Sequence, residues 1–225
     1  MILPVGHEQG INLVQEASPS TPLLDVRELE VWRGEAPLFS NVELTLDAGE
    51  ALFVAGRNGA GKSSLLRTLC GLGRPTRGEI RWSLAEGGEA ARHELLFIGH
   101  HNGLREAMSG LENLTLYQGL AGRSGDEEEC YRVLARFGLA ALAEQPVRLM
   151  SQGQRRRVAL CRLLLQPTRR VWVLDEPYTS LDRDSIDLLD EHIAGHLQAG
   201  GAAIITSHHS ASSSFPSRRF SLDQA

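Results

Sequence analysis

The chain has 225 residues, of which 42% are hydrophobic, and its formal net charge is −5. A chain of this length can bury a full hydrophobic core as one domain, or as a domain with a small second lobe. The acidic balance argues against nucleic acid as a partner, because nucleic-acid-binding proteins usually carry a basic excess. No apolar run approaches the roughly 20 residues that span a bilayer, so we expect any membrane role to depend on a partner.

The N-terminal segment, residues 1–22, has no sustained periodicity and ends in a stretch rich in Ser, Thr and Pro. We expect a loosely ordered extension here, followed by one domain over residues 23–225. Residues 1–10 lack the basic start and the apolar centre of a secretory signal.

The first part of the domain shows the alternation of half-buried strands. Leu29 and Val31 alternate with acidic residues, and Val42, Leu44 and Leu46 alternate with polar ones. An apolar residue at every second position places one face of a strand against a core. The pattern predicts an antiparallel sheet at the front of the domain.

Short, fully apolar runs predict a second sheet, buried on both faces. They cover residues 51–55, 171–174 and 202–205. A Gly-rich loop and a helix over residues 62–70 follow the first run, and an amphipathic helix over about 184–197 separates the other two. Strands that alternate with helices predict an α/β core with a parallel sheet.

Between these strands, residues 112–149 are largely helical in pattern, with breaks at Gly138 and Pro146. We expect a helical lobe over about residues 104–150. The predicted fold class is therefore an α/β core with a parallel sheet, an antiparallel β front and a helical lobe.

A Gly-rich segment carries the strongest chemical signal. It reads G-R-N-G-A-G-K-S and fits the pattern G-x-x-x-x-G-K-[ST] between a predicted strand and a predicted helix. Backbone N–H groups of such a loop surround phosphate oxygens, and the helix N-terminus adds its positive end. We expect Lys62 to bridge the β- and γ-phosphates of ATP and the Ser63 hydroxyl to bind Mg²⁺. The predicted phosphate loop comprises Gly56, Arg57, Asn58, Gly59, Ala60, Gly61, Lys62, Ser63 and Ser64.

Lys62 is the only lysine in the chain, and the other 22 basic residues are arginines. A compact ammonium group fits inside a loop that wraps phosphate, whereas a planar guanidinium is wider and favours bidentate partners. The single lysine therefore stands where arginine cannot replace it.

Two carboxylates end one of the apolar strands. Asp175 closes the run that begins at Val171, and Glu176 follows it. We expect Asp175 to hold Mg²⁺ through its water shell, and Glu176 to act as the base toward the attacking water. A strand followed by an acidic turn is common by itself, so this assignment depends on the phosphate loop in the same chain.

A capped helix supplies a second predicted anion site. Ser151 and Gln154, three residues apart, form the pattern of a capping box, and a helix is expected to run to about Leu165, before Pro167. The N-terminus of a helix attracts anions.

Together these segments resemble the ABC ATPases, whose core is a P-loop NTPase fold. The stretch M-S-Q-G-Q resembles the family signature L-S-G-G-Q, and it stands in family order with L-D-E-P-Y-T-S-L-D over residues 174–182 and with Thr206-Ser207-His208. The resemblance extends from about Leu23 to the C-terminus.

The resemblance implies a catalytic site that two copies of the chain share. Ser151, Gly153 and Gln154 of one copy would then close over ATP that Lys62 of the second copy holds. It further implies that residues 180–182, which end at Asp182, lie at the subunit seam.

The resemblance also implies that His208 touches the γ-phosphate. Taken by itself, His208 would be an ordinary histidine at the end of a strand.

Three positions depart from the common family pattern. Arg33, next to Trp32, stands where an aromatic usually stacks on adenine, and a guanidinium plane can also stack. Gln152 replaces a small residue of the signature. His100 stands where the family has the glutamine of the Q-loop, and it is followed by His101. The alternative is that this pair consists of plain loop histidines.

Three further features carry no predicted site. The three cysteines are odd in number and outside any C-x-x-C pair, so we expect packed, reduced cytosolic thiols. The run Arg155–Arg157 is expected to form a solvated helix face. His192 and His196 lie one helical turn apart, but Ile193 stands where a zinc-protease helix needs Glu.

Several segments resemble one branch of the family, the CcmA family of ATP-binding subunits of the cytochrome c maturation haem exporter. They are residues 37–40, 97–104, 111–114 and 155–163. The resemblance implies a peripheral subunit on the cytoplasmic face of the bacterial inner membrane. Its implied partners are a second copy, a membrane subunit like CcmB, and CcmC- and CcmD-like proteins.

Two alternatives stay open. One is a soluble ABC ATPase of a cofactor-assembly scaffold, which would carry the same ATP residues without a membrane partner. The other is the ATPase of a different ABC exporter. Translation and DNA-repair ABC proteins usually carry two cassettes or a long insertion, for which one cassette of this length leaves no room.

Overall fold

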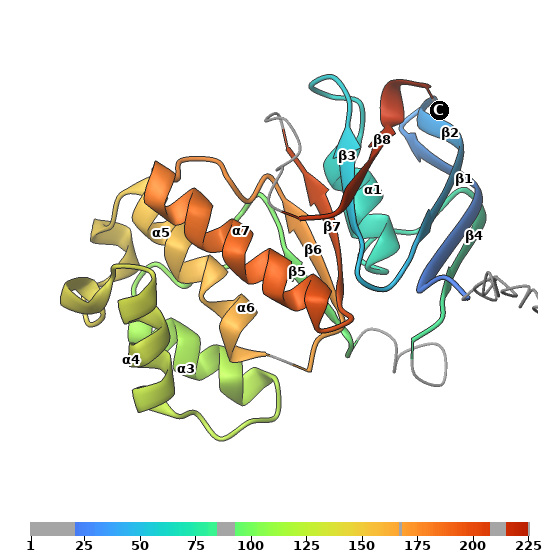
Figure 1. The fold of residues 1–225 in the computed structure, drawn as a ribbon. Coiled ribbons are helices and arrows are strands. Elements are labelled where there is room, and N and C mark those ends of the chain that lie inside the picture. The colour runs from blue at the N-terminus through green and yellow to red at the C-terminus, as the bar shows by residue number, and fades with distance from the viewer. Residues whose placement is uncertain (1–20, 85–92, 167, 208–214, 225) are drawn as a thin grey trace, which may run out of the picture.

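The computed structural model describes residues 21–84, 93–166, 168–207 and 215–224. The extension predicted over residues 1–22 lies almost wholly outside this part of the chain. The described residues form two sheets and a group of helices (Figure 1). No helix among them is both long and apolar enough to cross a membrane.

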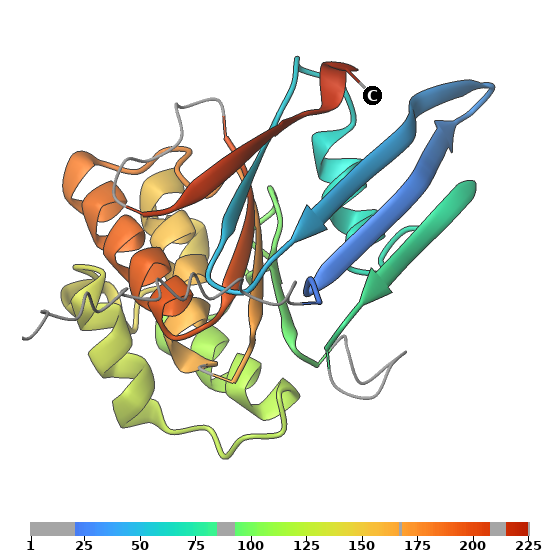
Figure 2. The same cartoon turned by 45° about the vertical axis from the view of Figure 1, so that its right-hand side comes forward.

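The first sheet is antiparallel, as the alternating pattern predicted. Its strand order is β2-β1-β4, and β1 pairs with both neighbours in antiparallel register. Its alternating apolar residues, such as Val42, Leu44 and Leu46, are buried on one face. Figure 2 shows this sheet beside the second sheet. The strand bounds are β1 Leu24–Arg33, β2 Ala36–Leu46 and β4 Arg77–Trp82.

The second sheet has the order β5-β6-β7-β3-β8, and all of its neighbouring strands are parallel. Every residue of β3, β6 and β7 is buried, which agrees with their apolar sequences. Because the strands run in one direction, the loops that follow them meet at the same edge of the sheet. The bounds are β3 Ala51–Ala55, β5 Leu95–Ile98, β6 Val171–Asp175, β7 Ala202–Thr206 and β8 Ser217–Ser221.

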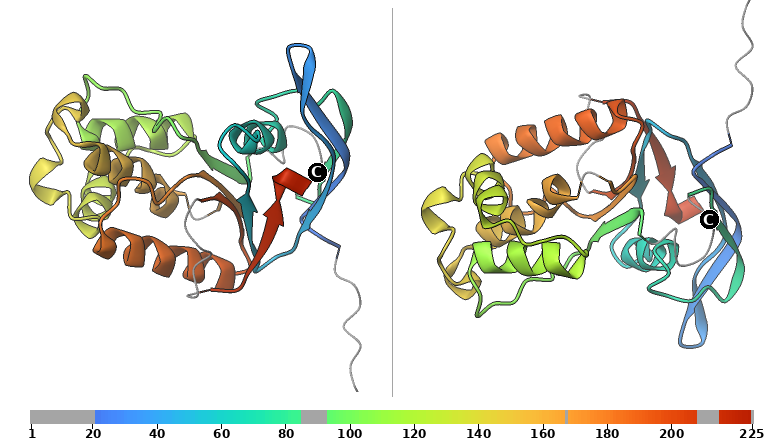
Figure 3. Two further views of the ribbon diagram at one scale, coloured as in Figure 1. Left: turned by 90° about the horizontal axis from the view of Figure 1, so that it is seen from above. Right: turned by 90° about the horizontal axis from the view of Figure 1, so that it is seen from below.

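Helices cover both faces of the parallel sheet. Helix α1 lies between the two sheets, whereas α5, α6 and α7 lie on the other side with the lobe of α3 and α4 beyond them (Figure 3). The α-helices are α1 Lys62–Leu69, α3 Gly110–Leu120, α4 Glu127–Arg136, α5 Gln152–Leu160, α6 Arg162–Leu165 and α7 Arg183–Gln198. Short 3-10 turns lie at η1 Ala140–Leu142, η2 Val147–Leu149 and η3 Leu222–Gln224.

One helix departs from its prediction. The helix expected from Ser151 to about Leu165 is interrupted at Cys161, which ends α5 and precedes α6. There the backbone tightens, because the Leu164 N–H donates to the carbonyl of Cys161, three residues earlier, at 3.1 Å.

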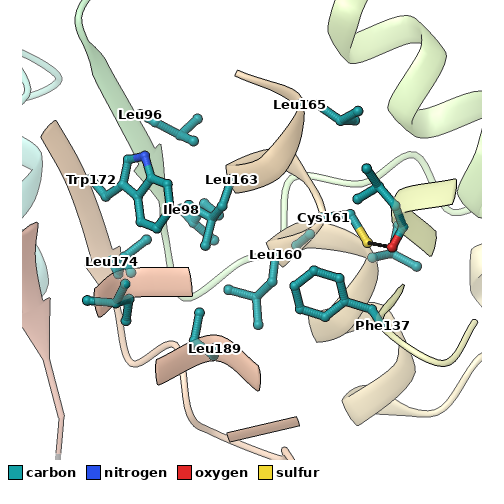
Figure 4. Packing of buried hydrophobic residues seen from close by; sticks show 14 of the residues in the cluster. Leu96, Ile98, Phe137, Leu160, Cys161, Leu163, Leu165, Trp172, Leu174 and Leu189 are labelled. Carbon is teal, nitrogen blue, oxygen red and sulfur yellow. Dashed lines mark hydrogen bonds between the residues drawn. The ribbon is translucent and has the colours of Figure 1, made fainter. Parts of the chain in front are cut away.

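The core divides into two clusters, one on each face of the parallel sheet. Ala51 and Phe53 of β3 belong to the cluster under the helices, and Leu52 and Val54 belong to the cluster under α1 and the antiparallel sheet. This alternation follows from the two-residue period of a strand. Figure 4 shows part of the first cluster, in which Leu160 of α5 reaches toward the sheet.

The three cysteines, Cys70, Cys130 and Cys161, are buried and unpaired, as the sequence predicted. The Cys161 thiol donates to the backbone carbonyl of Val133 at 3.9 Å (Figure 4). Burial raises the pKa of the Cys70 thiol to about 12, which keeps that sulfur protonated and unreactive at neutral pH.

Candidate functional site

The phosphate loop connects β3 to α1 at the carboxyl edge of the parallel sheet. Gly59 and Gly61 have φ values of 85° and 99°, in the region that favours glycine. A Cβ atom on Gly61 would lie 2.7 Å from Cγ of Leu38, so β2 packs directly against the loop. Backbone conformation and close packing therefore both require glycine at position 61.

The Lys62 side chain is only 6% exposed and lies beneath the loop. Its ammonium group donates to the carbonyl of Gly56 at 2.7 Å and to the carbonyl of Arg57 at 3.1 Å. Ser63 is exposed and Ser64 is partly exposed at the start of α1. Among the predicted loop residues, Arg57, Asn58 and Gly59 are also exposed, and Ala60 is partly so.

The two carboxylates at the end of β6, Asp175 and the following Glu176, lie at the same edge, with β7 between β6 and β3. Asp175 is 3% exposed, and its Oδ1 accepts a hydrogen bond of 2.7 Å from the hydroxyl of Thr206 on β7. The same hydroxyl accepts the N–H of Glu176 at 2.8 Å. Thr206 therefore fixes the orientation of the Asp175 carboxylate and the backbone of Glu176.

Glu176 itself has an unusual backbone conformation, with φ at 49°. A non-glycine residue in this region is uncommon and costs free energy, so its neighbours must hold it. The Glu176 N–H also donates to the backbone carbonyl of Thr206 at 3.2 Å. This kink at the end of β6 turns the Glu176 side chain out of the sheet, where it is partly exposed.

The capping box predicted at the signature helix is confirmed. The Ser151 hydroxyl accepts the Gln154 N–H at 3.2 Å, and the Gln154 side chain accepts the Ser151 N–H at 2.8 Å. A Cβ atom on Gly153 would lie 2.4 Å from the carbonyl oxygen of Ser180. Glycine at 153 is therefore required within one chain, for packing against the segment that follows β6.

Asp182 is the N-cap of α7. Its carboxylate accepts the Ser185 N–H at 2.9 Å. The hydrogen bonds of Ser185, from its side chain and then from its backbone, lower the pKa of Asp182. This local role explains an acidic residue here without reference to a second copy.

The run Arg155–Arg157 is not the solvated helix face that the sequence predicted. Arg156 is only 4% exposed, and its guanidinium donates to four oxygen atoms. They are the carbonyls of Gly99, Asp175 and Pro177, at 2.9, 2.7 and 3.3 Å, and Oδ1 of Asn102 at 2.9 Å. Burial lowers the pKa of Arg156 to about 10, which still leaves it charged at neutral pH. The signature helix is thus bonded to the end of β6 and to the loop after β5.

The flanking arginines of this run also bond to backbone carbonyls. Arg155 donates to the carbonyls of Met150 and Arg148, and Arg157 donates to that of Phe137 at 3.1 Å. The prediction of a solvated face was wrong because sequence spacing alone does not show which carbonyl groups of other segments face a helix.

His100 and His101 lie in the loop after β5, and both are exposed. Their rings meet edge to face, with centroids 5.7 Å apart. Both line a cavity of about 450 Å³ that Glu176 and Gln152 line as well. The structure thus brings together the histidine pair, the predicted base and the first turn of the signature helix, whereas no phosphate-loop residue lines this cavity.

The remaining predicted residues are spread more widely. Arg33 is the last residue of β1, exposed and paired with Ala36 across the β1–β2 hairpin. His208 lies outside the described residues. His192 packs near the Phe137 ring, and His196 stacks on Trp172 with centroids 3.9 Å apart, so each ring has an aromatic contact of its own.

Three residues of the site were not predicted from the sequence: Thr206, Arg156 and Asp223. Thr206 carried a partial signal, since it precedes the Ser-His pair at the end of an apolar strand. Asp223 accepts the backbone N–H of Arg57 in the phosphate loop, 166 residues away in sequence. No local pattern reveals a contact of that kind.

Comparison with known proteins agrees with this arrangement. The family model described as ABC transporter matches residues 39–179. A solved ATP-binding subunit of an ABC transporter superposes with a TM-score of 0.71 at 28% identity, over 83% of this chain and 79% of that one. A dimeric ATP-binding cassette bound to ADP and phosphate gives a TM-score of 0.71 at 20% identity, over 83% and 88% of the two chains, and so supports the fold. The fold is that of an ABC-type ATP-binding subunit.

Sequence relatives are more specific. The cytochrome c biogenesis ATP-binding export protein CcmA of Methylococcus capsulatus is 47% identical over 187 residues, covering 80% of this chain and 88% of that protein. CcmA of Escherichia coli K12 is 43% identical over 189 residues, covering 83% and 89%. The chain therefore belongs to the ABC transporter ATP-binding proteins and, among them, to the CcmA family. As an ABC ATPase it binds ATP and couples ATP hydrolysis to transport.

Proposed function

We propose that this chain is the ATP-hydrolysing subunit of a haem exporter that serves cytochrome c biogenesis. The observation that carries the proposal is its identity of 43–47% to proteins named for export in cytochrome c biogenesis, over 80–83% of this chain. Haem is the proposed cargo of the complex, and ATP is the substrate of this subunit. We propose a peripheral subunit on the cytoplasmic face of the bacterial inner membrane.

We infer that the working unit contains two copies of the chain on an integral membrane subunit like CcmB, with CcmC- and CcmD-like proteins associated. In each catalytic site, Ser151, Gly153 and Gln154 of one copy close over ATP bound by the other. The exposed position of Ser151 at a capped helix N-terminus supports this role, because its neighbouring N–H groups favour an anion. Asp182 would lie at the seam, beside its capping role.

We assign ATP binding to the phosphate loop. Its backbone N–H groups and the hydroxyl of Ser64 would hold phosphate oxygens, and the Lys62 ammonium would neutralise the charge of the β- and γ-phosphates. Arg33 would stack on adenine from the tip of the β1–β2 hairpin. A planar guanidinium is suited to stacking on a flat ring.

The carboxylate and hydroxyl near the loop fit Mg²⁺. This ion prefers oxygen ligands and usually keeps several waters. Ser63 presents an exposed hydroxyl, and Asp175 uses Oδ1 for Thr206, so its Oδ2 can face a metal-bound water. When bound, Mg²⁺ would reduce the negative charge of the phosphates.

We assign the general base to Glu176. Its side chain lies where the β6 kink directs it, beside the His100 loop and the signature helix. A carboxylate there would accept the proton of the attacking water and orient that water toward the γ-phosphate. His208 would contact the γ-phosphate, and His100 would take the place of the Q-loop glutamine between the site and the membrane subunit.

Purification from native membranes tests the function. A tagged chain should co-purify with an integral membrane protein of several spans and with a haem-handling protein, and a Lys62→Ala chain should capture the same partners. Recovery with a membrane subunit but without any haem-handling protein would favour a different exporter. Recovery with a soluble scaffold alone would overturn the membrane role.

A further inference from the structure

The C-terminal end of the described chain packs against the phosphate loop. Strand β8 lies parallel to β3, with Ser221 paired to Ala55, so both strands end at the same edge of the sheet. The short turn η3 follows β8 just as the phosphate loop follows β3 (Figure 1). Leu222 is 3% exposed, and a Cβ atom on Gly56 would lie 3.5 Å from its Cβ and 3.6 Å from Oδ1 of Asp223.

Asp223 bonds to the first peptide group of the loop. The Arg57 backbone N–H donates to both carboxylate oxygens of Asp223, at 3.1 and 3.0 Å. The carbonyl of Gly56, which belongs to the same peptide group, accepts from Lys62 at 2.7 Å. In a trans peptide these N–H and C=O groups point in opposite directions. One rigid peptide unit is therefore held between a carboxylate and an ammonium group.

This arrangement fixes the peptide and the lysine together. Both hydrogen bonds involve an ionised group, and such bonds are stronger than bonds between neutral groups. An ammonium group has three N–H donors, of which Lys62 gives two to the carbonyls of Gly56 and Arg57. A rotation of the Gly56–Arg57 peptide would move one of these acceptors and displace the ammonium group from under the loop.

We propose that Asp223 is a positioning residue for nucleotide binding, because it holds the Gly56–Arg57 peptide and thereby places Lys62 for the phosphates. The inference rests on the proposed ATP site at Lys62. It assigns a role in that site to a residue outside all the predicted motifs and outside the segment matched by the family model.

Two other roles for Asp223 make different predictions. A carboxylate near bound phosphates repels them, so if its charge were what mattered, its removal would strengthen binding. The ion pair with the Arg57 side chain, with Nε 3.4 Å from Oδ1, involves a guanidinium that is 87% exposed and would contribute little. The backbone bond alone requires an acceptor at position 223, whether or not it is charged.

Titration of the purified full-length chain with ADP and with ATP, each with Mg²⁺, separates these roles. We expect Asp223→Ala to raise the Kd of both nucleotides about tenfold, the scale of one lost hydrogen bond to a charged group. Asp223→Asn keeps an acceptor and should bind within about twofold of the native chain. In steady-state hydrolysis, Asp223→Ala should raise KM and leave kcat nearly unchanged.

Several outcomes would contradict the proposed role of Asp223. Native affinity in Asp223→Ala, tighter binding in both Asp223 variants, or equal weakening in Asp223→Ala and Asp223→Asn would each overturn the proposal. A fall in kcat as large as the rise in KM, together with a lowered Tm, would show a purely structural role. That result would also overturn the proposal. Lys62→Ala is the separate check: if it binds nucleotide like the native chain, the proposed ATP site fails, whatever Asp223 does.

Discussion

The phosphate loop and the loop after β5 both follow parallel strands at the carboxyl edge of the sheet, but different interactions fix them. The phosphate loop is shaped mainly by residues within its own motif, namely glycines at positive φ and Lys62 bonded to Gly56 and Arg57, with a further bond from Asp223. The loop that carries His100 is held from outside by two arginines that follow the signature sequence.

Those two arginines bond to the end of β5 and to the first part of the loop that follows it. Arg156 donates to the carbonyl of Gly99 and to Oδ1 of Asn102, at 2.9 Å each. Arg162 donates to the carbonyl of Phe97 at 2.9 Å and to that of Asn102 at 3.2 Å. The comparison shows that a sequence predicts a loop whose own residues largely set its conformation, whereas it does not predict the position of a loop that distant side chains hold.

The largest effect is expected from a substitution at Lys62 in the phosphate loop. Lys62→Ala should abolish ATP hydrolysis and weaken nucleotide binding, because the phosphates lose the only ammonium side chain in the protein. Lys62→Arg should fail as well, since a guanidinium is too wide for the space beneath the loop. Release of phosphate at saturating Mg-ATP measures both, and native turnover in either variant would refute the site.

The single lysine provides an independent test of the same site. An amine-reactive reagent has one lysine side chain to modify, besides the N-terminus. Mg-ATP should protect Lys62 from modification, and mass spectrometry of the 24.6 kDa chain would detect the difference. Labelling of Lys62 that is measurable without Mg-ATP and equal with it would contradict the assignment.

A smaller loss of hydrolysis is expected from a change at Glu176, which follows β6 between the two loops. Glu176→Gln should lower hydrolysis by about 10²-fold or more and keep ATP binding, because an amide cannot act as a base. The trapped nucleotide should then hold two copies together. Gel filtration with Mg-ATP measures this association. If two copies of the Glu176→Gln chain do not associate even when the membrane subunit is present, both the assignment of the base and the shared catalytic site are refuted.

Removing the Arg156 bonds to the loop after β5 should lower activity and stability rather than nucleotide affinity. Arg156→Lys keeps the charge but loses the planar fork, so several buried oxygens lose their donor. We expect the free energy of unfolding to fall by about 2 kcal/mol and hydrolysis to fall about tenfold, with the Kd for ADP unchanged. Arg155→Lys, in the same helix but half-buried, is the matched control and should change both quantities much less. A weakened Kd for ADP in Arg156→Lys would show that the two loops are not independently held.

The same contrast explains what the sequence could predict. Both sheets, the phosphate loop and the capping box follow from short periodic or local patterns, and the structure has each of them. The sequence did not predict the burial of Arg156, the Thr206 bridge between Asp175 and Glu176, or the bond from Asp223 to Arg57. Each of these joins segments that only the order of strands in the parallel sheet brings together. The break at Cys161 was missed for a related reason, since tertiary packing decides such short interruptions.

The smallest effect should come from His100. Imidazole and a glutamine amide can both donate and accept hydrogen bonds. We expect His100→Gln to retain hydrolysis, and His100→Ala to lose coupling of hydrolysis to the membrane subunit more than ATP binding. His101→Ala is the control, and the same cavity is also lined by Glu106, Glu176, Arg155 and Arg156. Loss of coupling only in His101→Ala would move the assignment by one residue, and no loss in either variant would make the pair plain loop histidines.

Covalently bound haem in c-type cytochromes tests the proposed function most directly. In cells whose native gene is replaced by the Lys62→Ala form, we expect haem-containing c-type cytochromes to disappear while total haem and the amount of this chain stay unchanged. The Arg81→Ala form, changed at an exposed arginine of β4 outside the site, should support native levels and serves as the control. Native levels of haem-containing c-type cytochromes in the Lys62→Ala cells would contradict an ATP-driven role in their biogenesis.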